Sequence, residues 1–276
     1  MDLIQTILMG LVQGLSEFLP ISSSAHLVLT SNFYKVFKGI EIFTESNQEI
    51  FLDIMLHLGT LIAVLIFFRK EIWEIIKALL SGNREDKNFK IGIYIIIGTI
   101  VSVLVAFPLK DVAGALVFKP AIVGILLIFT GSLLLYSENC SKKVLEKKRI
   151  NLKNSILIAI AQGLAALPGF SRSGLTIATG LLNGVGRAEA AKYSFLLSIP
   201  IILGASMLYP LITLDIKEVV TYNWTAIIVG TIVSGVSGYL CIKYFLKFVS
   251  KFSLSMFGYY CLAMGIFTVI FFSIIK

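Results

Sequence analysis

Two apolar stretches, each interrupted by proline and serine, decide the fold that this sequence predicts. Residues 152–186 read LKNSILIAIAQGLAALPGFSRSGLTIATGLLNGVG, and residues 2–37 read DLIQTILMGLVQGLSEFLPISSSAHLVLTSNFYKVF. The apolar runs on either side of each break are about 15 residues long, which is too short to cross a bilayer comfortably. Non-helical backbone at membrane depth is tolerated only where protein buries it or where it lines a wet cavity. Each stretch therefore predicts a re-entrant helical hairpin.

The composition indicates that lipid surrounds most of the chain. Of the 276 residues, 57% are hydrophobic and 14% are charged, against about 45–50% and 25% in ordinary soluble domains. The mean hydropathy is +0.90. A soluble fold of this size does not bury so much apolar surface. These values exclude a disordered protein, a nucleic-acid-binding domain and an ordinary cytosolic enzyme.

Six further segments have the length and low polarity of membrane-spanning helices. They are residues 50–68, 90–108, 119–137, 189–210, 223–246 and 253–275. The sequence thus predicts an all-α integral membrane protein with six transmembrane helices plus two re-entrant hairpins, in one membrane domain over residues 1–276. Both hairpins contain Gln-Gly-Leu before their Leu-Pro break, starting at Gln13 and Gln162, and each precedes three spans. This pattern predicts an inverted-topology repeat with halves of about 1–140 and 150–276.

The basic residues predict the orientation of this arrangement. If the first hairpin opens to the outside, 17 of the 24 Lys and Arg residues fall in inside segments, 6 fall outside, and Arg172 lies in the second break. The positive-inside rule favours this orientation, which places both termini outside and lets the two hairpin tips meet near the midplane. Residues 71–90 are predicted to form an interfacial amphipathic helix, with a solvated loop as the alternative. Glu41, Glu45 and Glu49 are expected to lie in a solvated loop.

The first break combines a carboxylate, an imidazole and several hydroxyls. Gln13 and Glu17 are four residues apart and share a helix face. Ser23 and His26 are three apart near the start of the next helix, so the spacing predicts a nucleophile beside a general base, or a histidine that protonates a leaving group. Ser22 belongs to a serine run that can cap this helix, and a helix N-terminus binds anions. Ionisable groups at membrane depth cost about 2.5–3.5 kcal/mol, which favours a functional role.

The second break repeats this design with a cation. Ser171, Arg172 and Ser173 lie where a helix begins, and Thr176 follows one turn later. The guanidinium fork matches a phosphate bidentately, and the hydroxyls with the helix-start N–H groups complete an oxyanion cradle. The alternative is a structural Arg172 that pairs with Glu17 across the hairpin tips, and both roles are compatible.

Two other polar features complete the set of candidates. His57 lies four residues after Asp53 on one helix face, which favours an interhelical hydrogen bond over catalysis. One carboxylate with Gln13 makes a poor metal cage. A divalent cation, Mg²⁺ or Ca²⁺, can nevertheless bridge Glu17 and the phosphates of a substrate, as hard cations do. Phosphoryl chemistry on a membrane anion is the reaction class that these residues indicate.

These motifs resemble those of the undecaprenyl-diphosphate phosphatases, the bacterial bacitracin-resistance family. The resemblance rests on Gln13-xxx-Glu17 followed by Leu-Pro-x-Ser-Ser-x-x-His ending at His26, and on Pro-Gly-x-Ser-Arg-Ser-x-x-Thr from residue 168 to Thr176. It covers the whole chain in length, number of spans and placement of motifs. Many members have Glu at the position of Gln13, and this departure weakens a two-carboxylate metal site.

The resemblance implies an enzyme of the bacterial inner membrane that hydrolyses undecaprenyl diphosphate to undecaprenyl phosphate and inorganic phosphate. This reaction recycles the lipid carrier for peptidoglycan and other wall polymers and is expected to give bacitracin resistance. The resemblance assigns catalysis to Glu17, Ser23, His26 and Arg172. It assigns diphosphate binding to Gln13, Ser22, Ser171, Arg172, Ser173 and Thr176. A divalent cation bound with the substrate is expected, with no nucleic acid and no obligate protein partner.

The architecture alone supports a second hypothesis. Inverted repeats with broken helices at the midplane are typical of transporters, and a flippase of lipid phosphates needs the same anion cradle. For a phosphatase, two reaction mechanisms remain possible, which differ in the nucleophile. Ser23 attacks phosphorus directly, or a water activated by His26 or Glu17 attacks while Ser23 binds phosphate.

Overall fold

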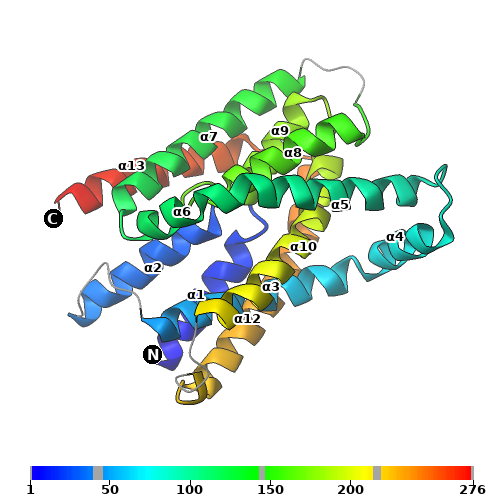
Figure 1. Ribbon diagram of the computed structural model, residues 1–276. Helices are drawn as coiled ribbons and strands as arrows, with labels where there is room; N and C mark the ends of the chain where they lie inside the picture. The colour runs from blue at the N-terminus through cyan, green and yellow to red at the C-terminus, as the bar shows by residue number, and fades with distance from the viewer. Residues whose placement is uncertain (1, 40–45, 143–146, 214–218, 275–276) are drawn as a thin grey trace.

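The computed structural model describes residues 2–39, 46–142, 147–213 and 219–274, and the described chain is built of helices (Figure 1). The helices are α1 (Leu3–Ser16), α2 (Ser23–Lys38), α3 (Asn47–Phe67), α4 (Arg69–Ser81), α5 (Lys87–Ala106), the 3-10 helix η1 (Phe107–Leu109), α6 (Lys110–Val117), α7 (Pro120–Lys142), α8 (Leu152–Leu164), α9 (Arg172–Leu182), α10 (Arg187–Thr213), α12 (Trp224–Val249) and α13 (Ser255–Ile274).

Six helical segments are long and apolar enough to cross a membrane, and they coincide with the six predicted spans. They are Asn47–Phe67, Lys87–Val117, Pro120–Lys142, Arg187–Met207, Trp224–Val249 and Ser255–Ile274. The second is longer than expected because η1 and α6 continue α5 beyond residue 108. The chain is therefore a multi-pass membrane protein. That α1–α2 and α8–α9 enter the membrane as re-entrant hairpins stays a prediction.

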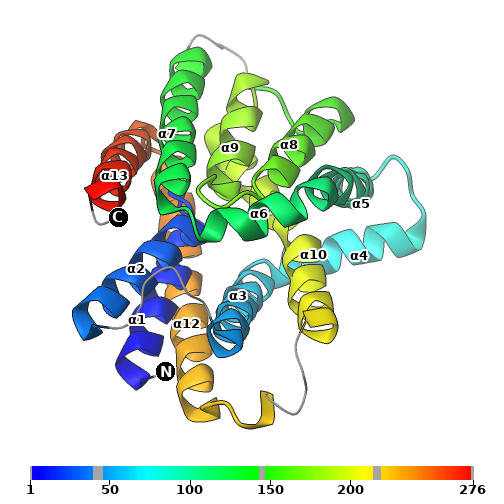
Figure 2. The same ribbon diagram turned by 60° about the vertical axis from the view of Figure 1, so that its left-hand side comes forward.

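Helices from the two predicted repeats pack against each other and do not form separate bodies. α12 packs along both α1 and α3, and α13 packs along α7 (Figure 2). Glycine permits the closest of these approaches. A Cβ on Gly14 of α1 would lie 2.5 Å from the backbone oxygen of Ser234 in α12, and a Cβ on Gly131 of α7 would lie 2.6 Å from the oxygen of Gly258 in α13. Small residues provide such contacts in lipid, where apolar side chains gain nothing by leaving water.

The two proline–serine breaks lie against each other, although about 150 residues separate them in the sequence. Ser22 donates to the backbone oxygen of Phe170 at 3.2 Å, and Ser173 donates to the oxygen of Leu19 at 2.8 Å. In each break the chain leaves one short helix and starts another: α1 and α2 flank the first, and α8 and α9 flank the second. This contact brings the starts of α2 and α9 together.

A buried carboxylate connects α7, the start of α10 and the residues just before α13. Glu138 of α7 is fully buried and accepts two hydrogen bonds from Arg187 at the start of α10, at 2.7 and 2.6 Å. It also accepts from the backbone N–H of Leu254, just before α13, at 2.9 Å. This bidentate pair offsets the cost of burying the charge. The sequence reasoning did not identify it.

Two expectations about polar segments need correction. The interfacial helix predicted over 71–90 is α4, which ends at Ser81, because Gly82 takes the left-handed conformation (φ +68°) that terminates helices. Glu49 does not lie in a solvated loop. It closes the capping box at the start of α3 and forms a buried ion pair with Lys35 of α2 at 3.0 Å. Glu41 and Glu45 lie outside the described residues.

We expect Arg187→Ala to lower the stability of the folded protein, because it leaves the Glu138 carboxylate buried and unpaired, at a cost of about 3–5 kcal/mol. Thermal unfolding of the purified protein in detergent measures this as a lower melting temperature. Arg84→Ala, in the exposed turn between α4 and α5, is the matched control and should melt like the wild type. Adding Glu138→Gln to Arg187→Ala should recover part of the loss. Equal melting temperatures for the two arginine variants would contradict this account.

Candidate functional site

The first break supplies the carboxylate at the centre of the site. α1 ends at Ser16, so Glu17 is the first residue past the helix, and its carboxylate is only 7% exposed. The Gln13 amide, one turn earlier on the same face, donates to Glu17 Oε2 at 3.0 Å. α2 then starts at Ser23, whose hydroxyl donates to the same oxygen at 2.7 Å. The Gln-xxx-Glu spacing thus forms the contact that the helical periodicity predicts.

The second break supplies the cation. Arg172 is the first residue of α9, with Ser171 as its N-cap: the Ser171 hydroxyl accepts from Gly174 N at 3.0 Å. Arg172 Nη2 donates to Glu17 Oε1 at 2.7 Å, so the ion pair joins the two breaks. Its Nη1 lies 3.5 Å from the backbone oxygen of Ser194 in α10. The predicted structural pairing of Arg172 with Glu17 is therefore present.

The remaining hydroxyls of the second break hold its backbone in place. Ser173 bonds the first break through Leu19, as described above. Thr176 donates to the backbone oxygen of Arg172 at 2.7 Å and shares a 2.6 Å hydrogen bond with Ser194. Ser171, Ser173 and Thr176 are all buried. Their present contacts position Arg172, and their binding to a diphosphate stays a prediction.

Ser22 holds the first break in a conformation that L side chains rarely adopt. Its φ is +70°, in the left-handed region that favours glycine, and such residues cost about 1–3 kcal/mol. Two contacts of its side chain compensate: the hydroxyl accepts from Ala25 N at 3.3 Å as the N-cap of α2, and it donates across to Phe170. The start of α2, with its positive dipole end, is thereby directed at the second break.

His26 is not paired with Ser23, contrary to the interpretation of their spacing. The Ser23 hydroxyl is bonded to Glu17, and His26 Nδ1 lies 2.8 Å from the backbone oxygen of Ser22. His26 Nε2 lies 2.7 Å from the hydroxyl of Tyr260 in α13. Spacing along one helix does not reveal a partner from another helix, so the sequence contained no signal for Tyr260.

His57 lies closer to the site than its sequence context indicated. Its Nδ1 bonds the backbone oxygen of Asp53 within its own helix, α3, at 2.7 Å. Its Nε2 faces the first break and lies 3.8 Å from Glu17 Oε2. Three helices, α1, α2 and α3, thus direct polar groups at one carboxylate oxygen.

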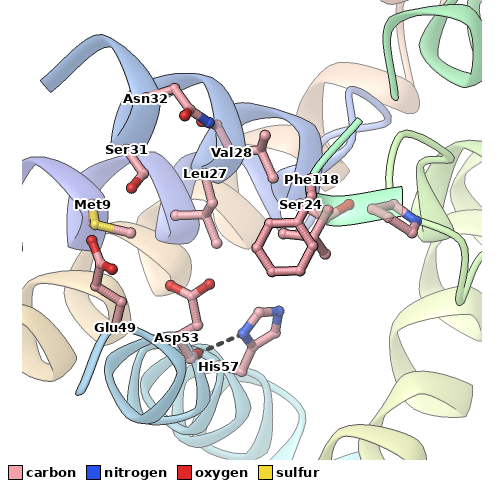
Figure 3. A pocket seen from close by; sticks show the side chains of 12 residues that line it. Met9, Ser24, Leu27, Val28, Ser31, Asn32, Glu49, Asp53, His57 and Phe118 are labelled. Carbon is pink, nitrogen blue, oxygen red and sulfur yellow. Dashed lines mark hydrogen bonds between the residues drawn. The ribbon is translucent and has the colours of Figure 1, made fainter. Parts of the chain in front are cut away.

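A cavity with a volume of about 120 Å³ lies beside this cluster, with His57 in its wall (Figure 3). Glu49, Asp53 and His57 follow one face of α3 along one wall, and Leu27 and Ser31 of α2 lie opposite (Figure 3). The lining is completed by Met9, Ser24, Val28, Asn32, Val117, Phe118 and Pro168. Ser24 and Pro168 belong to the two breaks, so the cavity borders the place where the breaks meet.

The donor set fits a metal ion only as a companion of a substrate. Among the described residues, no group of three or more His, Cys, Asp or Glu side chains is placed to hold an ion. Both Glu17 oxygens accept hydrogen bonds, from Arg172, Gln13 and Ser23. A divalent cation here has to take most of its ligands from phosphate oxygens and water, as Mg²⁺ commonly does.

Comparison with known proteins agrees with these motifs. The family model described as bacitracin resistance protein BacA matches residues 6–267. A protein named undecaprenyl-diphosphatase from Methanobrevibacter smithii is 40% identical, with 96% of each chain covered. Proteins of the same name from Methanosphaera stadtmanae and Halothermothrix orenii are each 38% identical, with 98% of each chain covered. The match to the family model and these identities over nearly the full length show that the chain belongs to the bacitracin resistance protein BacA family.

Proposed function

We propose that this protein hydrolyses undecaprenyl diphosphate to undecaprenyl phosphate and inorganic phosphate in the cell membrane. The observation that carries the proposal is the cluster of Glu17, Arg172 and Ser23, in which a buried carboxylate is bonded to a half-buried guanidinium and a half-buried hydroxyl. The names of the relatives support the same substrate. Such an enzyme recycles the lipid carrier of peptidoglycan synthesis, and its overproduction gives bacitracin resistance because it consumes the diphosphate that bacitracin binds.

In this mechanism Arg172 binds the diphosphate and stabilises the phosphoryl group during transfer. The guanidinium presents a planar set of donors that fits two phosphate oxygens, and the starts of α2 and α9 add backbone N–H groups beside it. Phosphoryl transfer depends mainly on such positioning and electrostatic stabilisation. The diphosphate competes with Glu17 for Arg172, and this competition loosens the resting ion pair when substrate binds.

Ser23 is the nucleophile that the hydrogen bonds favour. Its oxygen attacks the terminal phosphorus, its proton passes to Glu17 Oε2, and undecaprenyl phosphate leaves with the bridging oxygen. Glu17 first loses this proton to solvent and then deprotonates a water that attacks the phosphoserine. The P–O bond to Ser23 breaks, inorganic phosphate leaves, and the Ser23 oxygen takes a proton back from Glu17. The 2.7 Å bond from Ser23 to Glu17 supports this route. In the alternative, Glu17 activates a water for direct attack, and Ser23 only binds phosphate.

The other predicted site residues support Arg172, Ser23 and Glu17. Gln13 holds the Glu17 carboxylate through its amide, and Ser22 fixes the start of α2. Ser171, Ser173 and Thr176 hold Arg172 and contribute to binding of the diphosphate. His26 transfers a proton to or from the phosphates. A divalent cation, Mg²⁺ or Ca²⁺, would be held beside Glu17 mainly by the phosphate oxygens of the substrate, and it would neutralise part of their charge.

The orientation follows from the distribution of basic residues. We propose that both termini and the mouth of the first hairpin face the outside of a bacterial cell membrane, because 17 of the 24 basic residues then lie inside. The two halves of the chain form an inverted repeat in which the hairpins enter from opposite faces. This places the site where the two hairpins meet.

The first test is release of inorganic phosphate from undecaprenyl diphosphate by the purified protein in detergent. Arg172→Ala should lower kcat at least about 100-fold, because it removes the group that stabilises the transferring phosphoryl. Arg84→Ala is the matched control and should keep wild-type activity. EDTA should lower the rate of the wild type. Activity of Arg172→Ala within twofold of the wild type would refute the assignment. A folded wild-type protein that releases no phosphate would favour the flippase hypothesis.

The second test asks which oxygen attacks. With substrate labelled at the terminal phosphorus, rapid acid quenching should trap label on the wild-type protein as phosphoserine and none on Ser23→Ala. Ser23→Ala should also lose at least about 100-fold in kcat. Ser132→Ala, on an exposed face of α7, is the control. A fully active Ser23→Ala would eliminate the covalent route and leave attack by water.

The third test concerns topology. A tag on the C-terminus should be accessible to a membrane-impermeant reagent in intact cells, and a tag in the turn at residues 82–86 only after lysis. This result follows from the excess of basic residues in the inside segments. The reverse pattern of labelling would show that the orientation is inverted.

A further inference from the structure

His26 is held at both ring nitrogens, and the two partners come from opposite ends of the chain. Nδ1 lies 2.8 Å from the backbone oxygen of Ser22, one turn earlier. Nε2 lies 2.7 Å from the hydroxyl of Tyr260, which is 234 residues away in sequence. The two rings are also stacked, with centroids 5.6 Å apart and an interplanar angle of 11°. Two hydrogen bonds and a stacked face together fix the orientation of the imidazole.

The chemistry of these partners decides where the proton of the neutral imidazole lies. A carbonyl oxygen only accepts, so Nδ1 carries the hydrogen and donates to Ser22. Nε2 is then the acceptor, and the Tyr260 hydroxyl donates to it. The nitrogen that a second hydrogen bond selects in this way is the one that remains available for proton transfer. The bond to Ser22 therefore leaves Nε2 as the basic nitrogen of His26, and Tyr260 is its hydrogen-bond donor.

Tyr260 is held at this place by its neighbour in α13. Cys261 is fully buried, and its thiol donates to the backbone oxygen of Pro20 in the first break at 3.4 Å. This contact fixes the turn of α13 that carries Tyr260 against the break. Tyr259 is 66% exposed and Tyr260 is 40% exposed. The two adjacent tyrosines share the same chemistry, and Tyr260 is the one that contacts His26.

We propose that Tyr260 is a positioning residue for His26. Its hydroxyl holds the imidazole in the Nδ1–H tautomer, and its ring sets the angle at which Nε2 is presented at the start of α2. The effect of this residue on turnover rests on the proposed function, in which His26 transfers a proton during phosphoryl transfer. The contact itself is testable without substrate. Through Tyr260, the last helix of the chain takes part in a site that the two breaks build.

The direct test is ¹⁵N NMR of histidine-labelled protein in detergent. The chain contains two histidines, so four ring nitrogens are observed, and His57→Gln identifies those of His57. Tyr260→Phe should shift the Nε2 signal of His26, because it removes the donor and keeps the ring. Tyr259→Phe is the matched control and should shift neither histidine. An unchanged His26 spectrum in Tyr260→Phe would overturn the proposal.

Kinetics provide the second measurement. Tyr260→Phe should lower kcat about 10-fold with KM within twofold of the wild type, as loss of a partner that orients a functional histidine typically does. Tyr259→Phe should keep both parameters, and all three proteins should melt at the same temperature. A shifted NMR signal with wild-type kcat would show that the bond exists and does not serve turnover, which overturns the positioning role. Absence of phosphate release by the wild type would instead refute the proposed function and leave the NMR result standing.

Discussion

The structure depends on the buried ion pair between Glu17 and Arg172. A carboxylate with 7% exposure inside a membrane protein is tolerated only with full compensation. Here Arg172 donates to one oxygen at 2.7 Å, and Gln13 and Ser23 donate to the other. No single helix can supply this set. The pair therefore requires the two breaks to meet, and the packing of the remaining helices has to permit that contact.

The breaks explain why the chain interrupts its helices at all. A continuous helix uses its N–H groups internally, whereas a helix that starts inside the protein presents free N–H groups and a positive dipole end. Both α2 and α9 start where the breaks meet, and each has a serine N-cap. Proline and glycine stop the preceding run, and Ser22 accepts a strained φ to complete the turn. The strained backbone of Ser22 thus lies where the proposed mechanism places the anion.

Sequence patterns predicted the parts of the fold that follow from local composition. The six spans were found because apolar length is a property of each segment alone, and Gln13 with Glu17 because they share one helix face. The wrong predictions concern contacts between residues that are distant in the sequence. Ser23 was assigned to His26 by spacing, whereas its hydroxyl bonds Glu17. The partners Tyr260 of His26 and Arg187 of Glu138 come from distant helices. Such contacts depend on how helices pack, and periodicity contains no information about that.

Both carboxylate oxygens of Glu17 accept hydrogen bonds, and this affects how the site works. Every donor around it is a group that also binds phosphate: a guanidinium, a hydroxyl and an amide. Without substrate, the Glu17 carboxylate stands in for the phosphate and keeps these donor groups oriented. The donors therefore need to move little when a phosphate replaces it. In the proposed mechanism, an incoming diphosphate exchanges one anion for another at Arg172. The released carboxylate still lies beside the Ser23 hydroxyl, where the proposed mechanism requires a base.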